Sequence, residues 1–279
     1  MSPTTPFALG PAMLFAPADR PERFAKAAAR SDAVILDLED AVAPAAKAQA
    51  REHMVTASLD PHTTMVRINA LGTPDAALDL AALALSPFRT IMVAKAEDPQ
   101  AVAELTDYNV VVLCESAAGI LAAPALAQLP QVVALMWGAE DLLASLGGTS
   151  SRFPAGPRAG QYRAVAMQAR SQLLLAAGAA GKVAIDSIYA DIADLAGLAE
   201  ESEDAVASGF GAKACIHPGQ VPVIREAFHP TQAQLAAARE LLAAAEAAGT
   251  GVFAFKGQMV DGPILLHAEQ TLRRAASGS

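Results

Sequence analysis

Short apolar runs alternate with longer, alanine-rich stretches through most of the chain. Eight such runs occur: Ala12–Ala16, Ala33–Leu38, Met65–Ile68, Thr90–Ala94, Val110–Cys114, Val132–Met136, Lys182–Ile185 and Ala212–Ile216. Each is almost continuously apolar, which is typical of parallel strands that are buried on both faces. The stretches between them have helical patterns, for example Arg20–Arg30, Pro44–Thr56 and Asp75–Leu83. This repeated order predicts βαβ units around a parallel sheet.

Eight strand–helix units favour a closed (β/α)₈ TIM barrel, and 279 residues slightly exceed the usual size of one. An open, doubly wound sheet is the alternative. It would usually carry a glycine-rich loop after the first strand, and here that loop, Pro17–Arg20, contains no glycine. A chain of this length also leaves two domains open as an interpretation.

The C-terminal part of the chain exceeds what a barrel needs. Leu146–Pro157 is predicted as a long loop, which at this end of a barrel is often functional, with a helix from about Arg158 to Ala177. After the eighth strand we predict helices at Val221–Ala227, Thr231–Ala247 and Pro263–Ala275, with a loop before the last. We therefore expect a barrel over residues 1–228 and a helical arm over 229–279, acting as a lid or an oligomer element within one structural domain. The tail, residues 277–279, is expected to be disordered.

Composition narrows the function classes. The formal net charge is −9, and the only basic cluster is the pair Arg273–Arg274, which argues against a nucleic-acid binder. Cys114 and Cys215 each lie in an apolar run, which predicts buried, reduced thiols rather than a disulfide. No apolar stretch reaches the roughly 20 residues that span a bilayer, and the N-terminal segment lacks the features of a signal peptide. We therefore expect a cytoplasmic protein.

Polar side chains close nearly every predicted strand at its carboxyl end, where barrel enzymes build their active sites. They are Asp37, Glu39 and Asp40 at strand two, Arg67 and Asn69 at strand three, Lys95 at strand four, Glu115 and Ser116 at strand five, Glu140 and Asp141 at strand six, Asp186 and Ser187 at strand seven, and His217 at strand eight. Random strand termination does not predict such a pattern, so it indicates an enzyme.

Glu115 and Asp141 follow adjacent strands, so their carboxylates can converge. Two carboxylates together with water and substrate oxygens form a usual ligand set for Mg²⁺. The alternative is that these carboxylates only cap the helices that follow them.

Two further features could bind an anionic substrate. Arg67 can grip a carboxylate through two parallel hydrogen bonds; its alternative role is an ion pair with Asp37 or Glu39, for which we favour structural roles. The segment Trp137–Asp141 opens a helix, and its backbone N–H groups are expected to be free to hold an anionic oxygen. His217, which precedes a proline, is more typical of a structural residue.

These motifs together resemble the citrate lyase β-subunit-like proteins of the HpcH/HpaI aldolase group, which includes malyl-CoA and citramalyl-CoA lyases. The resemblance runs from about Met13 to Ala275. The elements that carry it are LDLEDAV, VRIN, E-[ST]-A-x-G and G-x-EDL, in this order, with MLFAPADRPERFAKA before them and KGQMVDGPIL after them.

The resemblance implies a role for several residues. Glu115 and Asp141 match the two Mg²⁺ ligands, and Arg67 matches the arginine that holds the carboxylate or carbonyl end of the substrate. The backbone of Gly138, Ala139 and Glu140, beside Asp141, matches the loop that receives the keto acid. Asp261 matches an aspartate that a neighbouring subunit delivers, and Arg20 and Lys26 fall where relatives contact CoA phosphates. Relatives usually have glycine in place of Ala18, and often threonine in place of Ala139.

The implied reaction is a reversible Mg²⁺-dependent cleavage of a 3-hydroxy-3-carboxyacyl thioester into a 2-keto acid and a thioester enolate, which Asp261 protonates. Citramalyl-CoA, malyl-CoA and citryl-CoA are the candidate substrates, and acetyl-CoA is the thioester product. The resemblance also implies a homo-oligomer, either a trimer or a hexamer. Three rival functions remain: the β chain of a citrate lyase that acts on an acyl-carrier protein, a CoA-independent pyruvate aldolase, and a non-catalytic binding protein. The aldolase would need another base, and His53 and His62 lie at poor places for it.

Overall fold

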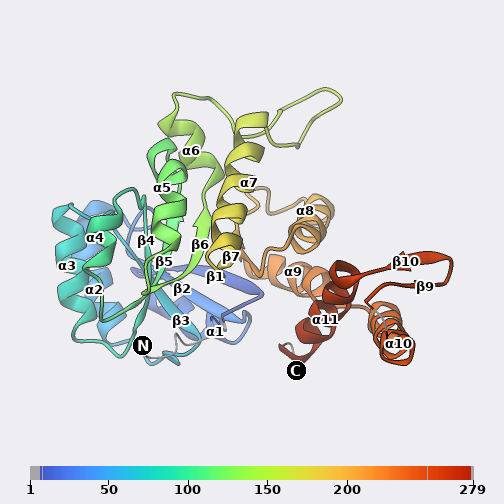
Figure 1. The fold of residues 1–279 in the computed structure, drawn as a ribbon. Helices are drawn as coiled ribbons and strands as arrows, with labels where there is room; N and C mark the ends of the chain where they lie inside the picture. The colour runs from blue at the N-terminus through green and yellow to red at the C-terminus, as the bar shows by residue number, and fades with distance from the viewer. Residues whose placement is uncertain (1–6, 8, 250, 278–279) are drawn as a thin grey trace. The chain divides into compact units, whose positions relative to one another are not determined.

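Eight parallel strands close into a barrel in the computed structural model, which describes residues 7, 9–249 and 251–277 (Figure 1). The strands are β1 (Ala12–Pro17), β2 (Ala33–Asp37), β3 (Thr64–Ile68), β4 (Thr90–Val93), β5 (Asn109–Cys114), β6 (Val132–Trp137), β7 (Val183–Asp186) and β8 (Ala212–Cys215). β1 pairs with both β2 and β8, so the sheet has no free edge. This confirms the closed TIM barrel and the eight predicted strands, whose bounds differ by one residue at most.

Helices connect successive strands and continue beyond β8 (Figure 1). The α-helices are α1 (Phe24–Ala28), α2 (Lys47–Val55), α3 (Pro74–Leu83), α4 (Pro99–Ala103), α5 (Ala117–Ala127), α6 (Ala139–Ser145), α7 (Ala164–Ala179), α8 (Leu195–Ser208), α9 (Val221–Phe228), α10 (Gln232–Ala248) and α11 (Gly262–Ser277). Three short 3₁₀ turns are η1 (Pro21–Arg23), η2 (Pro44–Ala46) and η3 (Pro218–Gln220). Several helices begin at side chains that accept a backbone N–H, such as Thr73, Ser116 and Thr231.

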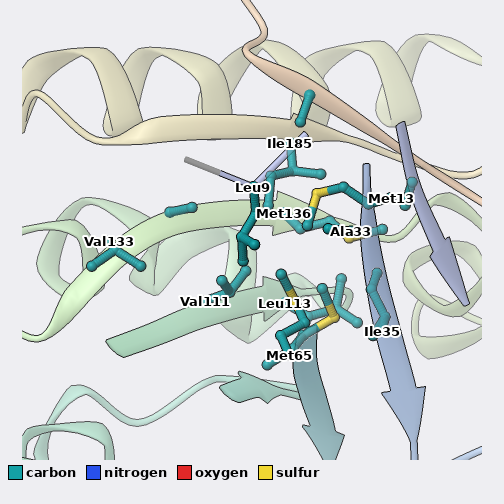
Figure 2. Close-up of a cluster of buried hydrophobic side chains, with 14 residues drawn as sticks. Leu9, Met13, Ala33, Ile35, Met65, Val111, Leu113, Val133, Met136 and Ile185 are labelled. Carbon is teal, nitrogen blue, oxygen red and sulfur yellow. The ribbon is translucent and has the colours of Figure 1, made fainter. Parts of the chain in front are cut away.

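Apolar side chains from alternate strand positions fill the barrel interior (Figure 2). The cluster includes Met13, Ile35, Met65, Met92, Val111, Leu113, Met136 and Ile185. The barrel is therefore a packed core rather than a pore, and chemistry is confined to the carboxyl ends of the strands.

Two predictions about the connections were wrong. The helix predicted from Arg158 begins at Ala164, because Gly160 adopts a φ of +79° and Arg152 pairs with Tyr162 across the loop. The segment after α10, predicted as a loop, contains a two-stranded antiparallel hairpin of β9 (Phe253–Phe255) and β10 (Gln258–Val260). Lys256 and Gly257 form its turn, both with positive φ.

The chain divides into two compact units, Met1–Ile224 and Arg225–Ser279, four residues before the boundary that the sequence predicts. The first contains the barrel, and the second contains α10, the hairpin and α11. That the second unit acts as a lid or an oligomer element stays a prediction, and Gly278 and Ser279 of the tail lie outside the described residues.

Both cysteines are buried and neither forms a disulfide, as predicted. Within the described part of the chain, no helix is both long and apolar enough to cross a bilayer.

Candidate active site

A cavity of about 360 Å³ opens at the carboxyl ends of the barrel strands. The residues that line it come from the ends of β1 to β3 and β5 to β8 and from the loop before α7. They are Phe15, Asp37, Asp40, Ala41, Arg67, Leu113, Glu115, Met136, Gly138, Ala139, Glu140, Asp141, Arg152, Ser187, Ile188, Ala190 and Ile216. Every barrel residue predicted for substrate or metal binding, apart from the proposed CoA contacts, is in this set.

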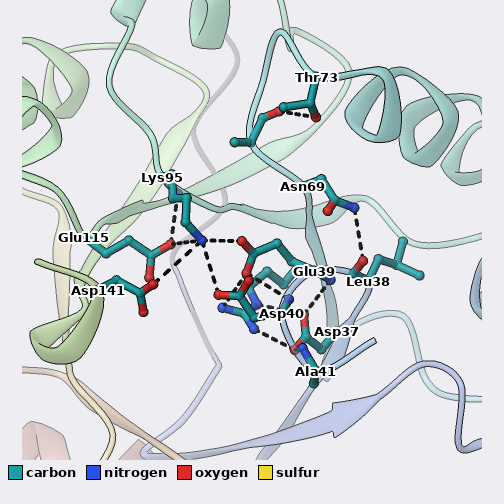
Figure 3. Close-up of polar contacts among 12 residues, drawn as sticks. Asp37, Leu38, Glu39, Asp40, Ala41, Asn69, Thr73, Lys95, Glu115 and Asp141 are labelled. Atoms are coloured by element: carbon teal, nitrogen blue, oxygen red, sulfur yellow. Dashed lines mark hydrogen bonds and ion pairs between the residues drawn. The ribbon is translucent and has the colours of Figure 1, made fainter. Parts of the chain in front are cut away.

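Glu115 and Asp141 converge on one wall of the cavity (Figure 3). Glu115 directly follows β5, and Asp141 lies in the first turn of α6, after β6. The ammonium of Lys95 lies 3.9 Å from Glu115 Oε1 and 3.8 Å from Asp141 Oδ1, so the two carboxylates share one cation. Lys95 adopts a φ of +49°, and its backbone N–H donates to Glu115 Oε1 at 3.0 Å. The backbone after β4 therefore holds this carboxylate in place.

Lys95 also contacts the carboxylates that follow β2. Its Nζ pairs closely with Glu39 Oε1 and lies 3.2 Å from Asp40 Oδ2. Burial alone would lower the pKa of Lys95, but the hydrogen bond to Glu39 and the charge of Glu115 raise it above its ordinary value. Lys95 therefore stays charged.

The pKa of Glu115 is raised to about 7. Burial is the largest cause, because removing a carboxylate from water disfavours its charged form, and the like charge of Asp141 adds to it. Arg67 and Lys95 oppose the shift without cancelling it. The two cations therefore do not offset the burial of Glu115 and the charge of Asp141.

The whole ion-paired group around these two carboxylates also has a net negative charge. It contains five carboxylates, Asp37, Glu39, Asp40, Glu115 and Asp141, and two cations, Arg67 and Lys95. With every group ionised, three negative charges remain, which suits a divalent cation. Among the described residues no three His, Cys, Asp or Glu side chains are placed to hold a metal together. A metal here would have two protein ligands, and other oxygens would fill its shell, as is usual for Mg²⁺.

Arg67 makes the ion pair that the sequence left open as its alternative role. Its Nε and Nη2 donate to Asp37 Oδ1 and Oδ2 at 2.8 and 2.6 Å, and its Nη1 lies 3.1 Å from Glu39 Oε2. Its guanidinium carbon lies 4.9 Å from the ring centre of Phe15. Asp37 and Glu39 thus have the structural roles that we favoured, and they fix the guanidinium of Arg67 against the cavity. Its contact with substrate stays a prediction.

The backbone after β6 differs from expectation. The N–H of Gly138 donates to the carbonyl of Cys114 at 3.3 Å, because the β5–β6 pairing continues one residue past the strand. The N–H of Ala139 makes a long contact of 3.4 Å with Ser187 Oγ. The expectation of free N–H groups was therefore wrong for Gly138. Glu140 is exposed on α6, and one of its carboxylate oxygens accepts from the hydroxyl of Ser151.

Gly138 has a second role, which is to leave room for Glu115. A Cβ at Gly138 would lie 2.7 Å from Glu115 Cβ and 2.9 Å from its Oε2. We predict that Gly138→Ala displaces the carboxylate and weakens Mg²⁺ binding by at least about tenfold, as misplacing an orienting group does. Titration calorimetry measures this. Gly178→Ala on α7, where a Cβ meets nothing within 4 Å, is the control and should bind like wild type. Unchanged binding by the Gly138 variant would contradict the packing argument.

The remaining predicted residues lie away from the cavity lining or in the second unit. Arg20 and Lys26 are exposed on the segment after β1 and do not line the cavity, so their CoA contact stays a prediction. Asp261 belongs to the second unit, where it is half-buried and directly precedes α11. His217 caps η3 by accepting the N–H of Gly219 at 3.1 Å, a structural role.

Sequence reasoning missed a buried network behind the β6–β8 wall. Lys213, fully buried on β8, donates to Asp186 Oδ2 at 3.0 Å, to the Ser187 carbonyl at 2.8 Å and to Glu201 Oε1 at 2.9 Å. Asp186 also accepts from Arg170 Nε at 3.0 Å. Burial would raise the pKa of Asp186, but Lys213 and Arg170 hold it below its usual range. The one available signal was a lysine within the apolar run AKACI.

Two family models match the chain. The model described as HpcH/HpaI aldolase/citrate lyase matches residues 11–218, and the one described as C-C bond lyase of the TIM-barrel fold matches residues 162–277. A citrate lyase subunit beta-like protein of Mycobacterium tuberculosis is 53% identical over 273 residues, which cover 98% of each chain. The mitochondrial citramalyl-CoA lyase of Homo sapiens is 31% identical and matches 95% of this chain and 85% of its own.

A solved structure shows the same fold. The protein CitE from Mycobacterium tuberculosis, in complex with magnesium, acetoacetate and coenzyme A, superposes with a TM-score of 0.91 at 52% identity. The match covers 97% of this chain and 99% of that one.

Proposed function

The chain belongs to the HpcH/HpaI aldolase/citrate lyase family of carbon–carbon lyases, and from this premise we propose that it cleaves or forms a 3-hydroxy-3-carboxyacyl thioester in a Mg²⁺-dependent reaction. The products of cleavage are a 2-keto acid and acetyl-CoA. The substrates that we propose are citramalyl-CoA, malyl-CoA and citryl-CoA, since a relative is named citramalyl-CoA lyase and a similar structure contains coenzyme A.

One observation supports the proposal most directly. The pKa of Glu115 is raised to about 7, chiefly because this carboxylate is buried and also because the half-exposed Asp141 lies beside it. The fixed guanidinium of Arg67 lines the same cavity. A keto acid chelated to a divalent cation would satisfy both features, and the similar M. tuberculosis structure contains magnesium with acetoacetate.

The proposal gives each residue a task. Glu115 and Asp141 would hold Mg²⁺, which when bound stabilises negative charge on the keto-acid oxygens. Arg67, kept charged and oriented by Asp37, would orient the carboxylate of the keto-acid half. Asp261 would deliver a proton to the methylene carbon of the departing thioester and would remove it in the condensing direction.

The test is a panel of citramalyl-CoA, malyl-CoA and citryl-CoA with Mg²⁺, in which acetyl-CoA release is followed. At least one thioester should be cleaved, and Asp261→Asn should lower kcat by about 10²- to 10⁴-fold, the usual contribution of a positioned acid or base. Near-wild-type activity of Asp261→Asn would remove the assigned role. If none of the thioesters is cleaved, the CoA-lyase proposal fails. That result would favour a citrate lyase β chain that acts on an acyl-carrier protein, or a non-catalytic binding protein.

Mg²⁺ affinity should depend on pH. Because the pKa of Glu115 is raised above 4.5, this group stabilises the metal-free fold at low pH, and that stabilisation is lost as the pH rises through about 7. Mg²⁺ binds only the carboxylate form, so protons compete with it below pH 7. We predict affinity about tenfold weaker at pH 6 than at pH 8, since one pH unit below a pKa leaves about a tenth of the group ionised. Calorimetry at both values measures it, and equal affinities would contradict the shift.

A further inference from the structure

Arg152 brings a second guanidinium to the cavity, on the wall opposite Arg67. Arg67 belongs to β3, whereas Arg152 contacts Tyr189, after β7, and Glu201, on α8. In the closed order β1 to β8, strands β3 and β7 face each other across the barrel. Both arginines line the cavity, and the carboxylates after β5 and β6 lie on the strands between them. A bound keto acid would therefore have one guanidinium toward each end.

The guanidinium of Arg152 is held in a fixed orientation. It lies 3.6 Å from the ring centre of Tyr162 and 4.8 Å from that of Tyr189. Its Nη1 donates to the carbonyl of Gly160 at 2.8 Å, and its Nη2 donates to Glu201 Oε2 at 2.6 Å. These two bonds use two of its five N–H groups, and 21% of its side chain is exposed. The other N–H groups of Arg152 thus remain as donors. The two rings hold the plane of the guanidinium in one orientation before a ligand binds.

The charges behind Arg152 form one connected network of ion pairs. Glu201, its partner, is shared with Lys213, and Lys213 is also paired with Asp186, which Arg170 contacts in turn. Arg170 also pairs with Asp204 on α8, so three cations face three carboxylates. The carboxylate of Asp204 is 60% exposed and is the most strongly screened by water, so this network brings no excess of negative charge to the cavity.

The two walls of the cavity therefore differ in charge. The wall with Glu115 and Asp141 has an excess of negative charge and suits a metal ion, whereas the β7 wall has a balanced charge network and a preoriented fork of donors. A fork of this kind binds carboxylates through paired, charge-assisted hydrogen bonds. Ser187, Ile188 and Ala190, which also line this wall, are uncharged, and the carboxylate of Glu140 in the lining accepts from Ser151.

We propose that Arg152 is a specificity-determining residue, which receives a second carboxylate on the keto-acid half of the substrate. This inference rests on the proposed function, because it names which keto acids that site prefers. A dicarboxylic keto acid such as oxaloacetate would offer a carboxylate to each guanidinium group, whereas pyruvate ends in a methyl group. Citryl thioesters would then be favoured over citramalyl thioesters.

The same contacts provide a reporter for binding. Arg152, Glu201, Lys213, Asp186, Trp137 and Tyr162 form a closed ring of side-chain contacts. Trp137 is the only tryptophan in the chain. It is fully buried, its Nε1 donates to Asp186 Oδ1 at 2.8 Å, and it directly precedes Gly138 in the cavity lining. Its fluorescence therefore reports on this wall without any turnover.

The experiment compares oxaloacetate with pyruvate, each with Mg²⁺, on the full-length protein. Binding is measured by calorimetry and by Trp137 fluorescence. In wild type, oxaloacetate should bind more tightly. In Arg152→Met its affinity should fall about 10- to 100-fold, which corresponds to the loss of a charge-assisted hydrogen-bond pair, while pyruvate affinity changes less than about threefold. Arg152→Lys, which keeps the charge and loses the fork, should fall between wild type and Arg152→Met for oxaloacetate.

The control is Arg158→Met, which removes an exposed arginine from the same loop and should leave both affinities as in wild type. If Arg152→Met weakens both keto acids equally, Arg152 only supports the loop and the proposal is overturned. It is also overturned if wild type binds both equally and the variant changes neither; the proposed function would survive that result. If neither keto acid binds wild type with Mg²⁺, the proposed function and this inference fail together.

Discussion

Glu115→Gln should weaken Mg²⁺ binding by at least about 100-fold, the upper range for residues that only orient metal ligands, and should abolish Mg²⁺-dependent turnover. The amide keeps the shape of the side chain and can still accept the N–H of Lys95, so the fold should persist. Because a buried, poorly compensated carboxylate is replaced by a neutral group, the metal-free variant should be at least as stable as wild type at pH 8. Thermal unfolding with and without Mg²⁺ measures both effects.

The control for this change is Glu104→Gln, which neutralises an exposed carboxylate at the end of α4 and does not touch the cavity. It should retain the Mg²⁺-dependent rise in melting temperature. A Glu115→Gln protein that Mg²⁺ still stabilises as strongly as wild type would show that the metal binds elsewhere. A variant that is strongly destabilised without metal would contradict our account of the raised pKa.

Lys213→Met should destabilise the fold by about 3–5 kcal/mol, the usual cost of removing one partner from a buried ion pair. Methionine fills nearly the same space, so the loss is electrostatic rather than a packing defect. All three N–H donors of Lys213 are used, and its removal leaves Asp186 and Glu201 without their shared cation. Urea unfolding of the metal-free protein measures the change.

Lys182→Met is the matched control, because Lys182 directly precedes β7 and, among the described residues, its half-buried side chain makes no hydrogen bond or ion pair. Its effect should stay within about 0.5 kcal/mol, as for most surface substitutions. If the two variants lose similar stability, the buried network contributes no more than a surface lysine does.

The strands and the positions of Glu115 and Asp141 at the cavity could be predicted because their signals are local. A parallel barrel strand is apolar over its whole length, so its bounds can be found within one residue, and the next polar residue lies at the active end of the barrel. The runs VVVLC and VVALM that precede Glu115 and Asp141 were therefore enough to place both residues at the cavity, and their metal binding stays a prediction.

The features that were missed depend on contacts between distant segments. Arg152 lies in a loop with no periodicity, and its partner Glu201 is 49 positions away. The start of α7 was misplaced because Tyr162 pairs back to Arg152, which no local pattern predicts. The N–H of Gly138 is engaged because β5 and β6 pair one residue further than the apolar run suggests. Three-residue strands such as β9 and β10 are too short for alternation to identify.

The position of Lys95 between Glu115 and Asp141 has a consequence for which ions the site accepts. The protein already supplies a tethered single positive charge at that place. A sodium or potassium ion would have to displace the ammonium of Lys95, which carries the same charge. The electrostatic energy gained by its binding would therefore be small. A divalent ion adds a net charge when Lys95 turns aside. We therefore expect Lys95 to favour a divalent ion such as magnesium over monovalent ions at this place.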